Sequence, residues 1–136
     1  FAEALPYFER ALRLSPDAPE LHNNLARVLG QLRRYEDAVP HLRRAVALKP
    51  DLLEAQVNLG SILAELGRPA EAETPLRAAV RLKPDFAYAY RKLGEVLLAQ
   101  GRRDEAVRVY EDGLRAAPGD ADLRQALEAA RAGVAP

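Results

Sequence analysis

The chain contains no cysteine and has no excess of either charge. The absence of cysteine excludes disulfide bonds, thiol catalysis and cysteine-based metal sites. It leaves the compartment unknown, with the cytoplasm favoured and the periplasm still open. Twenty Lys and Arg balance twenty Asp and Glu, whereas binding to nucleic acid through its phosphates normally needs a basic excess. We therefore expect no nucleic-acid partner.

Long apolar runs and catalytic motifs are also missing. A membrane-spanning helix needs about 20 consecutive, mainly apolar residues, and the sequence has no such stretch and no secretory signal pattern. It has no Gly-rich phosphate loop, nucleophile elbow or paired acids. His22 and His41, the only histidines, lack a local metal-binding motif. We expect no membrane insertion, no catalysis, no cofactor and no metal site.

One feature of the sequence is periodic: a proline recurs every 34 residues, at Pro16, Pro50, Pro84 and Pro118. A fixed period of this size indicates one supersecondary unit copied in tandem. Between successive prolines the apolar residues fall twice at helical spacing, for example over 21–32 and over 38–48. Each repeat therefore predicts a helix, a short turn and an antiparallel helix, and the fold class is all-α.

This period divides the chain into segments of one predicted domain, 1–136. The segments are a second helix alone in 1–18, complete repeats in 19–52, 53–86 and 87–119, and a capping helix with a tail in 120–136. Because the chain begins with Phe1 and its first helix lacks a partner, we expect it to be an excerpt of a longer protein.

Local signals agree with these boundaries. The Asp-x-x-Glu spacing at 17–20 and 51–54 is typical of a capping box. Gly67 and Gly101 lie at turns within repeats, where a left-handed residue ends a helix. Arg33 takes that place in the first full repeat, which predicts a strained or differently built turn. The arginine pairs 33–34 and 102–103 at these turns are expected to be solvated.

Two of the glycines inside predicted helices lie where neighbouring helices are expected to meet. Gly94 costs about 1 kcal/mol relative to alanine in a helix interior, so its presence predicts a close approach of the neighbouring helix. Gly113 stands where the other repeats have alanine and predicts a still tighter contact.

The motif residues of the third full repeat are Tyr90, Leu93-Gly94, Leu97, Ala106, Tyr110, Gly113 and Pro118. This order resembles the tetratricopeptide repeat (TPR), and the resemblance covers essentially the whole chain. It implies a right-handed α-α superhelix of antiparallel helix pairs, with about seven to eight helices. It also implies that the first helices of the repeats line a concave groove.

The polar residues left over on the first helices are the predicted partner-binding groove: Asn23, Asn24, Arg27, Gln31, Asn58, Ser61, Glu65, Tyr88, Arg91, Lys92 and Glu95. We expect a non-catalytic protein–protein interaction scaffold that binds a peptide or helix there. Replacing Asn24, Asn58 and Lys92 together is expected to weaken binding and leave helicity and melting unchanged.

Other resemblances leave alternatives open. Asn24-Leu25-Ala26 and Asn58-Leu59-Gly60 resemble the asparagine ladder of O-linked N-acetylglucosamine transferases, which implies a substrate-recruiting arm of a larger transferase. Lys92 breaks that ladder. A resemblance to clamps for chaperone tails rests on Asn58 and Lys92 alone.

The first helix offers a third alternative. It exposes residues such as Leu5, Phe8 and Leu12 for self-association. A homo-oligomer, as in an assembly module of a bacterial envelope system, is therefore also predicted.

Overall fold

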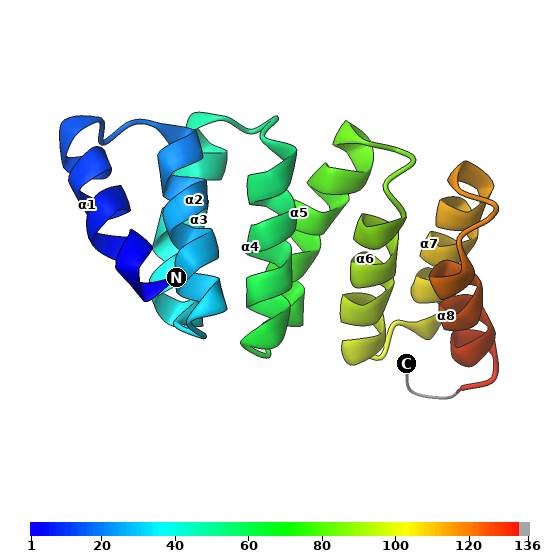
Figure 1. Ribbon diagram of the computed structural model, residues 1–136. Helices are drawn as coiled ribbons and strands as arrows, with labels where there is room; N and C mark the ends of the chain where they lie inside the picture. The colour runs from blue at the N-terminus through cyan, green and yellow to red at the C-terminus, as the bar shows by residue number, and fades with distance from the viewer. Residues whose placement is uncertain (134–136) are drawn as a thin grey trace. The chain divides into compact units, whose positions relative to one another are not determined.

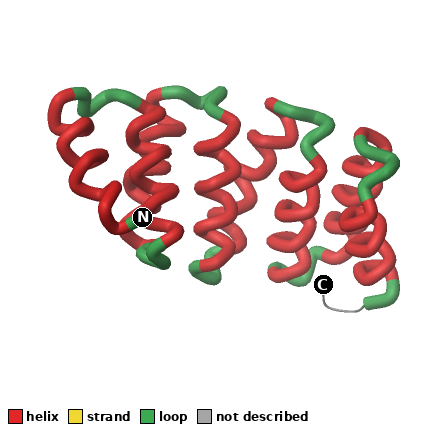
Figure 2. Tube along the Cα trace, viewed as in Figure 1, coloured by secondary structure: helices red, strands yellow, loops and turns green. Residues whose placement is uncertain are grey.

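The computed structural model describes residues 1–133, and all regular structure in that range is helical (Figures 1 and 2). Its contacts divide the chain into two compact units, 1–67 and 68–136. Unit 1 holds a 3₁₀ turn (Ala2–Ala4), α1 (Leu5–Leu14), α2 (Pro19–Gln31), α3 (Tyr35–Leu48) and α4 (Leu53–Glu65). Unit 2 holds α5 (Pro69–Leu82), α6 (Ala87–Ala99), α7 (Arg103–Ala116) and α8 (Ala121–Arg131). The predicted all-α class and helix number are confirmed for residues 1–133.

Within each unit one first helix is central. In unit 1, α2 packs against α1, α3 and α4; in unit 2, α6 packs against α5, α7 and α8. The pairs predicted for 19–52 and 87–119 are therefore α2–α3 and α6–α7. The division of the chain at Gly67 falls inside the predicted repeat 53–86, and the single domain stays a prediction. No helix within residues 1–133 is both long and apolar enough to cross a membrane.

The second helices bury a recurring set of small and large apolar residues. Ala38, Leu42 and Ala45 of α3 are completely inaccessible to solvent. The corresponding residues at the start of the chain are only half-buried: Ala4, just before α1, and Phe8 and Ala11 of α1. Because full burial of a Leu or Phe side chain contributes about 1.5–3 kcal/mol, α1 is held less firmly than α3.

One hydrogen bond repeats with the sequence period. The first-helix side chain six residues after each proline donates to that proline's carbonyl: His22 Nε2 to Pro16 O (2.7 Å), Gln56 Nε2 to Pro50 O (2.9 Å), Tyr90 Oη to Pro84 O (2.7 Å) and Arg124 Nη2 to Pro118 O (2.8 Å). Four different side chains can make this hydrogen bond because each carries an N–H or O–H donor. The repeated role assigns the ring proton of His22 to Nε2.

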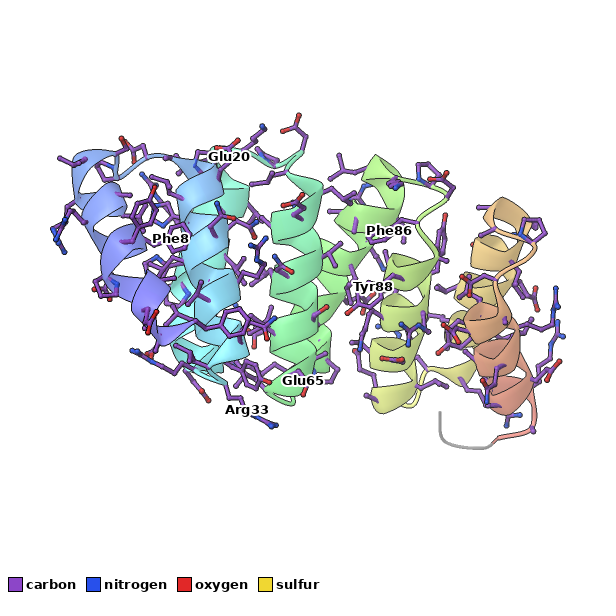
Figure 3. The ribbon with its side chains drawn as sticks, viewed as in Figure 1. Phe8, Glu20, Arg33, Glu65, Phe86 and Tyr88 are labelled. Atoms are coloured by element: carbon purple, nitrogen blue, oxygen red, sulfur yellow. The ribbon has the colours of Figure 1, made fainter. Side chains whose placement is uncertain are left out.

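The turns within repeats share one backbone conformation. Gly67 and Gly101 have φ of 72° and 75°, as predicted, and Arg33 has φ of 61°. The first full repeat thus builds the same turn without glycine, at a cost of about 1–2 kcal/mol for a non-glycine residue. The Arg33 side chain points away from the helices at this turn (Figure 3).

The predicted capping boxes do not form. The N-cap residues of α2 and α4 are Ala18 and Leu52, and neither helix start has a side-chain cap. The helices begin two residues after the aspartates, so Asp17 pairs with Arg44 instead. After Pro118, Gly119 takes the place of the aspartate and Asp120 stands at the N-cap of α8, where its Oδ1 accepts from the Leu123 N–H at 2.8 Å.

Both glycines lie in close approaches, as predicted, but the contact at Gly113 is less tight than the contact at Gly94. A Cβ placed on Gly94 would lie 2.1 Å from Cε1 of Tyr110, and a Cβ on Gly113 would lie 2.8 Å from Cβ of Tyr90. Alanine at Gly94 would require the Tyr110 side chain to shift, and alanine at Gly113 would require the Tyr90 side chain to shift.

Candidate functional site

In unit 1, most of the predicted groove residues share one surface. Asn24, Arg27 and Gln31 occupy the side of α2 opposite to Leu25 and Leu29 by helical spacing. None of these three polar side chains has a hydrogen-bond or ion-pair partner within residues 1–133. On α4 the surface continues with Asn58, Ser61 and Glu65, and Figure 3 labels Glu65 at the end of that helix. We refer to these six residues as the α2–α4 face.

Asn23 differs from its neighbours because it is buried, with 2% of its surface exposed. Asn58 Nδ2 donates to Asn23 Oδ1 at 2.9 Å and so joins α2 to α4. Asn58 is only half-buried, and its Oδ1 remains as an acceptor. Asn23 is therefore a structural residue beneath the face rather than a surface contact.

In unit 2 the predicted residues form a charged cluster on α6. The cations Arg91 and Lys92 lie over the Tyr88 ring, 5.3 Å and 5.7 Å from its centroid, and Figure 3 labels Tyr88. Glu95 pairs with both, at 3.3 Å from Lys92 and 4.0 Å from Arg91. The cluster, called the α6 face below, is preorganised by these contacts and offers both charges to a partner.

Sequence reasoning did not identify a cavity of about 650 Å³ between α1 and α3. The residues lining this α1–α3 cavity are Glu9, Leu12, Arg13, Pro16, His22, Leu25, Leu29, Arg34, Glu36, Asp37, Pro40 and His41. They come from two second helices with α2 beneath, so no single stretch of sequence signals the cavity. The sequence offers one hint of this cavity: His22 and His41 lie on the two helices of one predicted pair.

The two histidines meet in this cavity. Their Nδ1 atoms lie 3.1 Å apart and their ring centroids lie 5.4 Å apart. The difference between these two distances is about the sum of the two ring radii. The two Nδ1 atoms therefore point almost straight at each other, as in an N–H···N hydrogen bond. Because His22 carries its proton on Nε2, His41 Nδ1–H is the donor. Burial, then the nearby His22, lowers the pKa of His41.

Residues 1–133 contain no cluster of three or more metal-ligating side chains. The Tyr110 hydroxyl is buried without a hydrogen-bond partner, and burial raises its pKa to about 12. Its ring packs against Gly94, so packing explains why this tyrosine is buried.

Comparison with known proteins identifies the repeat. The family model described as tetratricopeptide repeat matches residues 1–52, 23–85 and 57–121. A crystal structure of MamA protein is 28% identical, with a TM-score of 0.88 over 96% of this chain and 71% of that one. No curated protein matches the sequence significantly.

Two further solved structures show the fold alone. MamA from Desulfovibrio magneticus RS-1 is 23% identical, with a TM-score of 0.88, and the match covers 97% of this chain and 75% of that one. The first TPR of Spaghetti (RPAP3), bound to an HSP90 peptide, is 20% identical, with a TM-score of 0.77 over 85% and 91% of the two chains. The likenesses confirm the predicted class of fold, antiparallel helix pairs in tandem.

Proposed function

Because the chain belongs to the tetratricopeptide repeat family, we propose that it is a non-catalytic scaffold that binds a peptide or helix of a partner protein through the first helices of its repeats. The observation that carries this proposal is the α2–α4 face, where unpartnered Asn24, Arg27 and Gln31 lie beside the anchored Asn58. Such side chains can bond a peptide backbone without first breaking bonds within the protein.

The α6 face supports the same proposal in unit 2. Lys92 and Glu95 present both charges on a rigid helix beside the Tyr88 ring. Aromatic side chains and cations of this kind often dominate protein–protein contacts. A partner of mixed charge fits this face better than a uniformly acidic or basic one.

The experiment is a binding measurement with a selected peptide. A random peptide library is panned on the wild-type protein, and the dissociation constant of a recovered peptide is measured by calorimetry. The variant Asn24→Ala/Arg27→Ala/Lys92→Ala is expected to bind at least about tenfold more weakly, since each lost hydrogen bond of a charged group is worth about 1.5–3 kcal/mol.

A matched control removes three exposed charges elsewhere: Arg10→Ala/Arg81→Ala/Glu128→Ala. It is expected to bind like the wild type. If the recovered peptides bind the first variant as tightly as the wild type while both remain folded, the first helices are not the binding surface.

The structure also changes which residues should be replaced. Removing the Asn58 side chain would leave the buried Asn23 amide without its partner, at a cost of about 1–3 kcal/mol. The expectation that a variant including Asn58 keeps its melting temperature is therefore revised, and Arg27 takes its place in the experiment.

Self-association is a second candidate function, favoured by one specific observation. Three of the four large apolar residues that are strongly exposed within residues 1–133 lie before or in α1: Phe1, Tyr7 and Leu14, with 72%, 69% and 81% of their surface accessible. Exposed apolar groups of this kind are typical of contact surfaces.

A further inference from the structure

The two units contain the same groove between second helices, filled differently. The repeat period places α1 in register with α5, and α3 in register with α7, two repeats apart. In unit 2 the positions that correspond to Glu9, Asp37, Pro40 and His41 line a cavity of about 310 Å³, whose other lining residues all lie on α7. The α1–α3 cavity is about twice that volume. The comparison shows which side chain fills the space in one unit and not in the other.

In unit 2 a guanidinium of α5 reaches across the groove. Arg77 Nε lies 2.8 Å from Glu73 Oε2 on its own helix, and Arg77 Nη2 lies 3.7 Å from Glu105 Oε2 on α7. Arg102 binds the same Glu105 from the turn that precedes α7. One acid on α7 thus holds two arginines.

Unit 1 retains the acid but lacks the crossing guanidinium. Asp37 corresponds to Glu105 and Arg34 corresponds to Arg102, and their ion pair is kept at 2.8 Å. Glu9 stands at the position of Arg77 and has no hydrogen-bond or ion-pair partner within residues 1–133. At these two positions the cavity therefore has two carboxylates, Glu9 and Asp37, where unit 2 has a cation and a carboxylate.

Glu9 and Asp37 both line the cavity and both act electrostatically on His41. Both carboxylates favour the protonated form of His41, although burial and His22 together lower its pKa. The remaining rim charges, Arg13 and Glu36, offset each other. The rim therefore keeps one net negative charge, contributed by Glu9.

The floor of the cavity is apolar and is separate from the α2–α4 face. It consists of Leu12 from α1 and Leu25 and Leu29 from α2, all nearly buried. Helical spacing puts Leu25 and Leu29 on the side of α2 opposite to Arg27. The aliphatic stem of a long cationic side chain fits such a floor.

We propose that the α1–α3 cavity binds an arginine side chain of a partner polypeptide, with its guanidinium between Glu9 and Asp37 and its stem over Leu12 and Leu25. Arginine fits better than lysine because its planar fork can donate to two carboxylates at once. In unit 2, Arg77 donates to Glu73 and forms an ion pair with Glu105. This second site lies outside the proposed peptide-binding first-helix faces and does not depend on them.

The experiment is an NMR titration of the wild-type protein with the capped peptide acetyl-Leu-Arg-Leu-amide. The peptide acetyl-Leu-Gln-Leu-amide is the matched control for the charge. We expect saturable shifts of backbone amides at Leu12, Asp37 and His41, and at least fivefold weaker binding of the glutamine peptide. Absence of saturable shifts at these residues, or equal binding of the two peptides, would overturn the proposal.

Two variants test the assignment of Glu9. Glu9→Gln should weaken binding of the arginine peptide at least fivefold, and Glu9→Arg, which restores the arrangement of unit 2, should abolish it. Glu128→Arg on α8 makes the same charge change at an exposed site and should leave binding unchanged. If Glu9→Arg binds the peptide like the wild type, or Glu128→Arg weakens binding equally, the proposal fails.

Discussion

Arg33 has the backbone conformation that the corresponding turns give to glycine. Its side chain is exposed and makes no hydrogen bond within residues 1–133, so nothing there offsets the left-handed φ. The sequence already indicated this position, because the 34-residue period aligns Arg33 with Gly67 and Gly101. The conformation itself required the structure.

Arg33→Gly is expected to stabilise the protein by about 0.5–1 kcal/mol, because relief of the left-handed strain exceeds the entropic cost of glycine. The measurement is chemical unfolding in urea. The reverse change, Gly101→Arg, meets no atom within 4 Å of its new Cβ and should destabilise by about 1 kcal/mol. Equal stability of all three proteins would show that the turn carries no strain.

Gly94→Ala is expected to destabilise by about 1–3 kcal/mol, because the new methyl group would overlap the buried Tyr110 ring. The control is Gly30→Ala, whose Cβ would meet only Ile62 Cδ1 at 3.4 Å. This control should gain stability, up to about 1 kcal/mol, from helix propensity. Thermal unfolding of both variants checks the opposite signs, and stabilisation by Gly94→Ala would contradict the close approach.

At the scale of elements, charged side chains join helices in unit 2. Glu73 of α5 accepts from Arg77, from Gln100 at the end of α6 and from Arg102 at the turn before α7. The turn arginine Arg102 was expected to be solvated. Its side chain is 34% exposed, but it also forms ion pairs with Glu73 and Glu105. Sequence reasoning could not find the network because Glu73 and Arg102 are 29 residues apart and only the packing of α5 on α6 brings them together.

Glu73 is expected to stabilise unit 2 in a pH-dependent way. Although burial raises its pKa, hydrogen bonds from Arg102, Arg77 and Gln100 lower the pKa from 4.5 to about 2. The ionised carboxylate therefore stabilises the fold above pH 4.5, and this contribution disappears as the pH falls toward 2. Glu73→Gln should cost about 1–2 kcal/mol at pH 7, since solvent screens the partly exposed arginines.

The measurement is urea unfolding of the wild type and Glu73→Gln between pH 7 and pH 2. The difference between the two proteins should shrink over the acidic part of this range. Glu128→Gln, at an exposed position of α8, is the control and should show little difference at any pH. A difference for Glu73→Gln that is the same at every pH would contradict the role of its charge.

At the scale of the whole molecule, exposed apolar surface is concentrated at α1. Phe1, Tyr7 and Leu14 are strongly exposed, and the apolar face that contains Phe8 is half-buried where the same positions of α3 and α7 are fully buried. The sequence predicted a first helix with Leu5, Phe8 and Leu12 uncovered. Leu5 and Phe8 are half-buried, but Leu12 is buried, so the prediction is wrong for Leu12.

If α1 mediates self-association, Tyr7→Lys/Leu14→Lys should shift the protein toward the monomer. Both changes replace strongly exposed apolar side chains by a charge, so they should not disturb the core. Sedimentation velocity at several concentrations is the measurement, with Arg81→Ala/Glu128→Ala as a control at exposed polar sites of unit 2. A wild-type protein that stays monomeric at high concentration would contradict self-association.

The sequence by itself determined the features that depend on neighbours along the chain. The 34-residue period, the helical spacing of apolar residues and the glycines at turns predicted the helix pairs, because these features are set within one or two turns of backbone. Tertiary structure decided what two helices do together. It buried Asn23 under Asn58, paired His22 with His41 and opened the cavity beside Glu9. Each outcome depends on which faces of separate helices meet, and no local pattern in the sequence records that.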